Sequence, residues 1–201
     1  AAESHRARMI VLDLRPDLYF GARDRLMAKS ACLVAAWLGW ESLALQEPVG
    51  LIIPGKDEIA PRRGRRHLLG LLDAITAAYQ TPVSGGNASD VLDAASLALG
   101  RGDEICLISD LPVHPAALAE QARCLSRLRR MRIYLVEDRV LTGPVVPGRY
   151  PSRGPDGVRR TPVVGSNSVS DDDADRRREL IEAGWDLVEA MDILPRGVAA
   201  A

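Results

Sequence analysis

The sequence predicts an α/β fold, a doubly wound and mostly parallel sheet with helices on both faces. Residues 8–12 (RMIVL) and 104–108 (EICLI) are almost continuously apolar, which is typical of strands covered on both faces rather than on one. Segments with helical periodicity separate these strands, and such alternation places successive strands in parallel. Only 4% of the residues are aromatic, so Leu, Val, Ile and Ala must build the core between helices and sheet.

The first half of the chain alternates strands with helices. Residues 23–40 have charges in the first turns and apolar residues on nearly all sides afterwards, which predicts a deeply buried helix. Residues 49–53 form an apolar run between Pro48 and Pro54 and predict a second short strand. Residues 56–61 are expected to form an edge strand, where Pro61 is tolerated. Residues 66–79 repeat apolar side chains at helical spacing, and residues 90–99 do the same.

The second half continues this pattern. After the strand at 104–108, residues 115–130 predict a helix with Pro115 at a favourable early position. Residues 132–136 predict a strand, whereas residues 139–170, rich in Gly, Pro and Ser, predict a loop or a small edge hairpin. Residues 171–191 predict an amphipathic helix, whose opening aspartates suit the positive end of a helix dipole.

Length and composition narrow the class of protein. The 201 residues suit one domain, 1–201, and an opening directly into a strand suits a domain that is part of a longer protein. The formal net charge of -1 gives no reason to expect a nucleic-acid surface. No segment has the length and composition of a membrane span. Cys32, Cys106 and Cys124 are odd in number, and we expect buried free thiols and a cytoplasmic location.

A candidate site lies where two predicted strands end. Asp13 follows the strand at 8–12, and Ser109-Asp110 follow the strand at 104–108. Ligands of open parallel sheets bind beyond the carboxyl ends of the strands, where the strand order reverses. A carboxylate there is costly unless it is paired, hydrogen-bonded or bound to a cation. If the two strands are neighbours, Asp13 and Asp110 converge.

These residues resemble one bacterial family. The elements that carry the resemblance are a strand–Asp–loop–Phe–Gly opening that ends at residues 20–21, PRRGRR at 61–66, LISD at 107–110, and the LTGP and PGRY elements within 141–150. Together they resemble the domain of unknown function 58 family over nearly the whole chain. That family is similar to von Willebrand factor A domains, which implies the same doubly wound fold.

The resemblance also implies a site. Von Willebrand factor A domains often hold a metal ion on an Asp-x-Ser-x-Ser loop, a threonine and a later aspartate. Asp13 matches the first aspartate and Asp110 the last, whereas Arg15 and Asp17 stand in place of the two serines. Asn87 is the candidate for the threonine position.

Two interpretations of this site remain open. Asp13, Asp17, Asn87 and Asp110 could hold Mg²⁺ or Mn²⁺, since carboxylate and carbonyl oxygens are suitable ligands. Alternatively, the guanidinium of Arg15 replaces the cation, because it is permanently charged and bidentate toward carboxylates. We favour the second interpretation, a degenerate site without a cofactor.

The resemblance implies a non-catalytic function: the domain would bind proteins as an adaptor and would work with a MoxR-type AAA+ ATPase. The contact surface would include Arg15, Ser109 and Gly86 beside the aspartates. The alternatives are a metal-dependent hydrolase that uses Asp13, Asp17 and Asp110, or a structural domain with a vestigial site. A phosphatase that needs a second aspartate two residues after the first is disfavoured, because Arg15 occupies that position and cannot deliver a proton.

Overall fold

The structure is a computed structural model. The residues that it describes are 6–19, 26–81, 88–112, 115–137, 148–149, 152–153, 159–160, 163–164 and 170–190.

The core of the fold is a six-stranded sheet of order β10-β5-β4-β1-β2-β3. All neighbouring strands are parallel except β2 and β3, which pair antiparallel at one edge. The predicted doubly wound, mostly parallel sheet is therefore confirmed. The strands of this sheet are β1 (Arg8–Leu12), β2 (Val49–Ile52), β3 (Ile59–Arg62), β4 (Glu104–Ser109), β5 (Arg130–Leu135) and β10 (Trp185–Glu189).

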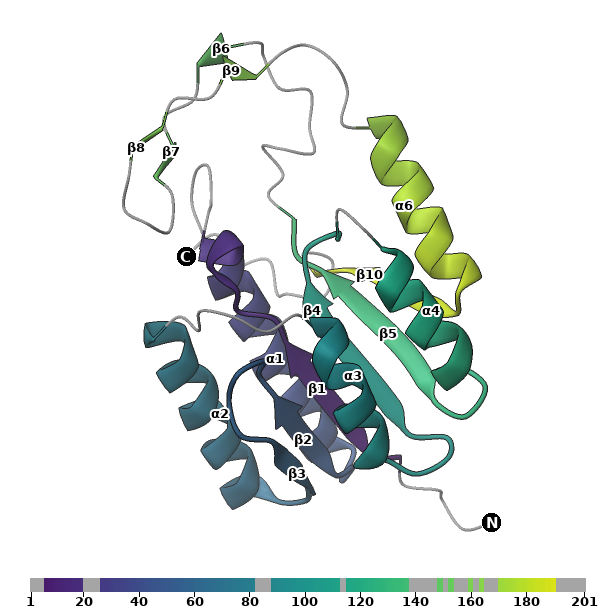
Figure 1. Ribbon diagram of the computed structural model, residues 1–201. Coiled ribbons are helices and arrows are strands. Elements are labelled where there is room, and N and C mark those ends of the chain that lie inside the picture. Colours follow the sequence, from purple (N-terminus) through teal and green to yellow (C-terminus); the bar gives the residue numbers. More distant parts are fainter. Residues whose placement is uncertain are drawn as a thin grey trace.

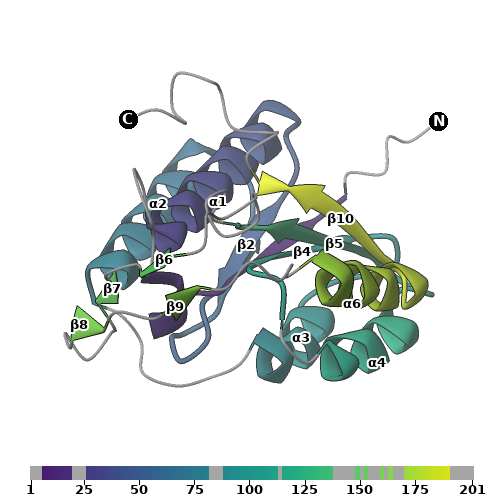
Figure 2. The same cartoon turned by 90° about the horizontal axis from the view of Figure 1, so that it is seen from above.

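Helices cover both faces of the sheet, as Figures 1 and 2 show. One face carries α1 and α2, and the other carries α3, α4 and α6. The buried side chains form two hydrophobic clusters, one for each face. Ile10 and Leu12 of β1 belong to the first cluster, and Met9 and Val11 to the second, because successive side chains of a strand point to opposite faces. The helices are α1 (Met27–Ala44), α2 (Arg65–Gln80), α3 (Ala88–Leu97), α4 (Ala116–Leu125) and α6 (Ser170–Glu182), with a short 3-10 helix η1 (Pro16–Tyr19). Among the helices of the described residues, none is both long and apolar enough to cross a bilayer.

The prediction of one final helix over residues 171–191 is wrong in its second half. Helix α6 ends at Glu182, and β10 follows as an edge strand parallel to β5. Gly184, with a φ of 105°, turns the chain between them, a conformation that an L side chain rarely adopts. Trp185 is consequently buried in the sheet, where its indole N–H donates to the carbonyl oxygen of Leu118 at 3.2 Å.

The segment predicted as a loop or small edge hairpin contains four two-residue strands. They pair antiparallel as β6 (Gly148–Arg149) with β9 (Val163–Val164), and β7 (Ser152–Arg153) with β8 (Arg159–Arg160). These pairs form two separate sheets and add no strand to the main one. The predicted helix over residues 115–130 is shorter, because α4 ends at Leu125, and the edge strand predicted over residues 56–61 begins only at Ile59. The predicted helix 23–40 begins at Met27 and continues to Ala44.

Candidate functional site

The polar groups of the predicted site meet at the carboxyl edge of the sheet. Strands β1 and β4 are neighbours, and Leu12 pairs with Ile108 in their register. The residues that follow these strand ends therefore lie side by side. The backbone N–H of Asp13 donates to the carbonyl oxygen of Ile108 at 3.0 Å, which carries the pairing one residue further. The predicted convergence of Asp13 with Ser109-Asp110 is thus what the topology produces.

Asp13 is buried, with 2% of its surface exposed. Its Oδ1 accepts a hydrogen bond from the backbone N–H of Arg15 at 3.1 Å, and its Oδ2 accepts one from the Ser109 hydroxyl at 2.7 Å. The Nε of Arg15 lies 3.0 Å from the same Oδ2. Its N–H does not point at an acceptor, so this contact is an ion pair rather than a hydrogen bond. A buried carboxylate with such partners avoids the cost of an unpaired charge.

Arg15 joins the two predicted aspartates. Its Nη2 forms an ion pair with Oδ1 of Asp110 and lies 3.4 Å from the Ser109 hydroxyl. The side chain is 32% exposed, so one part of the guanidinium faces the carboxylates and another faces solvent. Pro16 follows directly and opens η1, which holds the loop close to the strand end.

Burial and charge act in opposite directions on Asp110. Burial raises the pKa of its carboxyl, the Arg15 guanidinium lowers that pKa, and the neighbouring Asp13 carboxylate raises it again; the net direction is upward. The Asp110 side chain is 28% exposed. Asp110 is therefore a half-buried carboxyl whose protonation depends on the position of Arg15.

The other predicted site residues are not part of this cluster. Asp17 lies on η1, is exposed, and makes no hydrogen bond or ion pair with the described residues. Asn87 and Gly86 lie outside the described residues, so their part in the predicted site is not tested. The structure brings together Asp13, Arg15 and Asp110 with Ser109, which the sequence analysis had assigned to the contact surface for a partner.

The arrangement fits a guanidinium better than a divalent cation. Mg²⁺ requires several oxygen ligands that converge on one position. Here the oxygens of Asp13 face the N–H and O–H groups of Arg15 and Ser109, and Arg15 lies between the two carboxylates. Within the part of the chain that the structure describes, no cluster of three or more acidic, histidine or cysteine side chains is arranged to hold a metal ion. A cation bound between Asp13 and Asp110 would have to displace Arg15.

A second arginine bridges two carboxylates farther along the same edge. Arg177 of α6 forms ion pairs with Glu137, just after β5, and with Glu189, the last residue of β10. Burial raises the pKa of Glu137, and Arg177 opposes this shift. Sequence reasoning missed this pair because it assigned Glu189 to a helix. A strand ending at Glu189, parallel to β5, would have placed both glutamates at the carboxyl edge.

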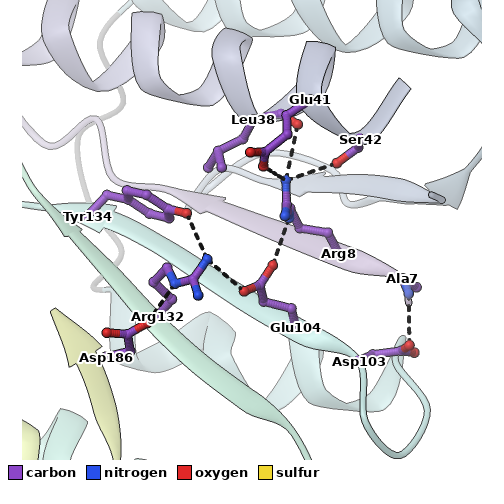
Figure 3. Close-up of polar contacts among 10 residues, drawn as sticks. All are labelled: Ala7, Arg8, Leu38, Glu41, Ser42, Asp103, Glu104, Arg132, Tyr134 and Asp186. Carbon is purple, nitrogen blue, oxygen red and sulfur yellow. Dashed lines mark hydrogen bonds and ion pairs between the residues drawn. The ribbon is translucent and has the colours of Figure 1, made fainter. Parts of the chain in front are cut away.

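The opposite end of the strands carries a row of charges on the face covered by α1, in which Arg8 and Glu104 are buried (Figure 3). Arg8 of β1 donates to Glu104 of β4 at 2.8 Å and to Glu41 of α1 at 2.7 Å. Arg132 of β5 lies 3.1 Å from Glu104 and 2.9 Å from Asp186 of β10. Four strands and one helix are thereby joined by ion pairs at the amino end of the sheet.

The three cysteines have different exposures. Their thiols are free, as predicted, but only Cys106 is buried; Cys32 is half-buried and Cys124 is exposed. Burial raises the pKa of the Cys106 thiol, and the neighbouring Glu104 carboxylate adds to this shift. Cys106 therefore stays protonated and packs as a small apolar side chain.

Comparison with known proteins identifies the fold. No protein-family model matches the chain, and a search of curated proteins finds no match. The structure of this chain is similar to that of the conserved hypothetical protein BatB from Bacteroides thetaiotaomicron. The TM-score is 0.60 and the identity is 14%, over 92% of this chain and 90% of the BatB chain.

Two further structures agree. An aerotolerance-related membrane protein from Bacteroides fragilis NCTC 9343, with multiple mutations to serines, gives a TM-score of 0.60 and 14% identity over 92% of both chains. The SpRpn10 VWA domain gives a TM-score of 0.52 and 15% identity over 92% of this chain and 87% of that domain. Membership of the domain of unknown function 58 family stays a prediction. The architecture and these likenesses show that the chain has a von Willebrand factor A-like fold.

Proposed function

We propose that this domain is a non-catalytic protein-interaction module that binds its partner at the carboxyl edge of the sheet, without a metal ion. The observation that supports this proposal is the position of Arg15. It forms ion pairs with Asp13 and Asp110, yet 32% of its side chain remains exposed. In related domains, a partner's carboxylate completes the coordination of the bound metal. Here the guanidinium provides the positive charge instead.

The nitrogen donors of the Arg15 guanidinium do not all face the two aspartates. Nε and Nη2 face Asp13 and Asp110, whereas Nη1 makes no ion pair or hydrogen bond with any described residue. An arginine held at a fixed angle by two carboxylates loses little side-chain entropy when it binds a further group. The exposed part of Arg15 would therefore accept a carboxylate or a carbonyl oxygen of the partner through charge-assisted hydrogen bonds.

Of the three aspartates that a hydrolase would use, Asp13 and Asp110 are already paired with Arg15, and Asp17 lies exposed on η1 outside their cluster. A hydrolase that used Asp13 and Asp110 would need an open metal position and a nearby general base. Glu104 lies at the opposite end of β4 in ion pairs with Arg8 and Arg132. Glu137 is paired with Arg177. These contacts support a binding role over an enzymatic one.

The proposed partner is a MoxR-type AAA+ ATPase. This choice of partner rests on the sequence resemblance alone. The test is a titration of a purified MoxR-type AAA+ ATPase with the wild-type domain, Arg15→Ala and Arg123→Ala. Arg123 is an exposed arginine in the last turn of α4, so this control removes the same charge far from the carboxyl edge.

We expect Arg15→Ala to weaken binding about tenfold or more, because a charge-assisted hydrogen bond contributes about 1.5–3 kcal/mol. Arg123→Ala should bind like the wild type, and a chelator should have no effect. Equal binding by Arg15→Ala would contradict the role of Arg15. Absence of binding by the wild type would contradict the choice of partner and favour a structural domain.

A further inference from the structure

Two loops form a basic and apolar corner at the amino edge of the sheet, away from the site described above. One loop links α3 to β4 and the other links α4 to β5, and both project beyond the same end of the strands (Figure 1). The exposed side chains of this corner are Leu97, Arg101, Arg127, Leu128 and Arg130.

Hydrogen bonds from the backbone and from one arginine side chain hold the two loops together. The N–H of Gly102 donates to the carbonyl oxygen of Leu128 at 2.7 Å, and the N–H of Arg130 donates to that of Asp103 at 2.9 Å. Arg129 donates to the carbonyl oxygens of Ser96 and Leu99 at 2.6 and 3.0 Å. The corner is therefore a single surface whose parts keep their relative positions.

The corner has a strong local charge although the chain is nearly neutral. Residues 96–103 and 125–130 contain four arginines and one acidic residue, Asp103. The Arg129 side chain donates hydrogen bonds to carbonyl oxygens at the end of α3. The Asp103 carboxylate accepts hydrogen bonds from the backbone N–H groups of Ala7 and Gly100. Arg101, Arg127 and Arg130 are exposed and make no ion pair with the described part of the chain.

The apolar members of the corner are as exposed as its arginines. Leu97 is 88% exposed and Leu128 is 46% exposed. An exposed leucine by itself is ordinary. Leu97 at the end of α3 and Leu128 in the loop after α4 lie beside three arginines that have no ion pair among the described residues. This combines cations for an anionic surface with short apolar groups that can enter it.

We propose that this corner docks the domain onto a membrane surface that contains anionic lipids. The arginines contact phosphate and other acidic headgroup oxygens, and Leu97 and Leu128 enter the region just below the headgroups. The attachment is peripheral and reversible, because two leucines bury little apolar area. It leaves the carboxyl edge, at the other end of the strands, free for a protein partner.

The test is sedimentation of the purified domain with vesicles of phosphatidylcholine alone and with about 30% phosphatidylglycerol, at about 0.1 M and 0.5 M salt. Three variants are compared: the triple change Arg101→Gln, Arg127→Gln and Arg130→Gln; the double change Leu97→Ser and Leu128→Ser; and a control, Arg63→Gln, Arg65→Gln and Arg66→Gln. The control removes the same charge from exposed arginines just before α2 and in its first turn.

We expect the wild type and the control to bind the anionic vesicles at low salt, and neither to bind phosphatidylcholine alone. The corner triple variant should bind at least about tenfold more weakly, since each arginine near an anionic surface contributes about 1 kcal/mol. The double leucine variant should also lose affinity at unchanged charge. Equal loss in the control, undiminished binding by the leucine variant, or no binding by the wild type would each overturn the proposal. Thermal unfolding of every variant shows whether it is folded.

Discussion

At the scale of single residues, Arg15 supplies the positive charge that compensates two aspartates at the carboxyl edge. Asp13 and Asp110 follow neighbouring strands, and both are ion-paired to this one guanidinium. Without it, two carboxylates would share a partly buried site, which favours protonation of one of them. The Ser109 hydroxyl adds a hydrogen bond to Asp13 but no charge. The protonation of Asp110 is therefore the quantity that should respond to a change at Arg15.

Replacing Arg15 by alanine should raise the pKa of Asp110 further above its ordinary value. Burial and the Asp13 carboxylate already raise this pKa, and Arg15 is the first cause that opposes them. NMR titration of the side-chain carboxyl carbon of Asp110 in the wild type and in Arg15→Ala measures the change. Arg123→Ala serves as the control, with an unchanged titration.

The pH dependence of stability has a defined sign. Because the pKa of Asp110 is higher in the folded than in the unfolded chain, protonation of this group favours the folded state as the pH falls through its folded pKa. The contribution of Asp110 to the stability of the fold is smallest above that pKa.

A titration of Asp110 that does not shift in Arg15→Ala would show that the guanidinium does not interact with this carboxylate in solution.

At the scale of elements, one glycine separates α6 from β10. Gly184 has a φ of 105°, and a Cβ atom added there would lie 2.8 Å from Cβ and Oγ of Ser126. Gly184→Ala should therefore lower the free energy of unfolding by about 2 kcal/mol, through backbone strain and this close approach.

Gly70 provides the matched comparison. It lies on an exposed face of α2, and nothing is within 4 Å of an added Cβ. Gly70→Ala should raise the free energy of unfolding by about 0.5–1 kcal/mol, because alanine favours a helix interior. Urea unfolding of both variants measures the two effects. A stabilised Gly184→Ala would mean that the boundary between α6 and β10 is misplaced.

The row of charges at the amino end joins β1, β4, β5, β10 and α1, and Glu104 is its centre. Its side chain is 3% exposed and lies between Arg8 and Arg132. Glu104→Gln leaves the buried Arg8 with less compensation and should destabilise the fold by about 3 kcal/mol. Asp186→Asn is the control: the Asp186 side chain is 62% exposed, so its loss should cost about 1 kcal/mol or less. Chemical unfolding that gives equal losses for both would contradict the role of burial.

The strength of the sequence signal explains which elements could be predicted. Strands β1 and β4 are almost continuously apolar after a charged first residue, and their predicted and observed limits agree within one residue. Strand β10 (WDLVE) is short, carries two acidic residues and follows a helix without a proline or a long loop. Its helix-like apolar spacing was misleading, and only the turn at Gly184 separates the two elements.

At the scale of the whole molecule, topology determines what sequence could reveal about the site. Asp13 and Asp110 were predicted to meet because each follows a buried strand, and parallel neighbours end at one edge. The contacts of Arg177 with Glu137 and Glu189 could not be predicted in this way. They depend on how α6 packs and on a strand that the sequence pattern did not indicate.

The central claim is that Arg15 takes the place of a cation at the carboxyl edge. The most direct measurement is a calorimetric titration of the chelator-treated domain with Mg²⁺ and then Mn²⁺, repeated with Asp13→Ala. We predict no saturable binding to the wild type, with the fold and thermal stability intact throughout. Saturable binding that disappears in Asp13→Ala would contradict the claim, because it would show that a cation displaces Arg15 from between the two aspartates.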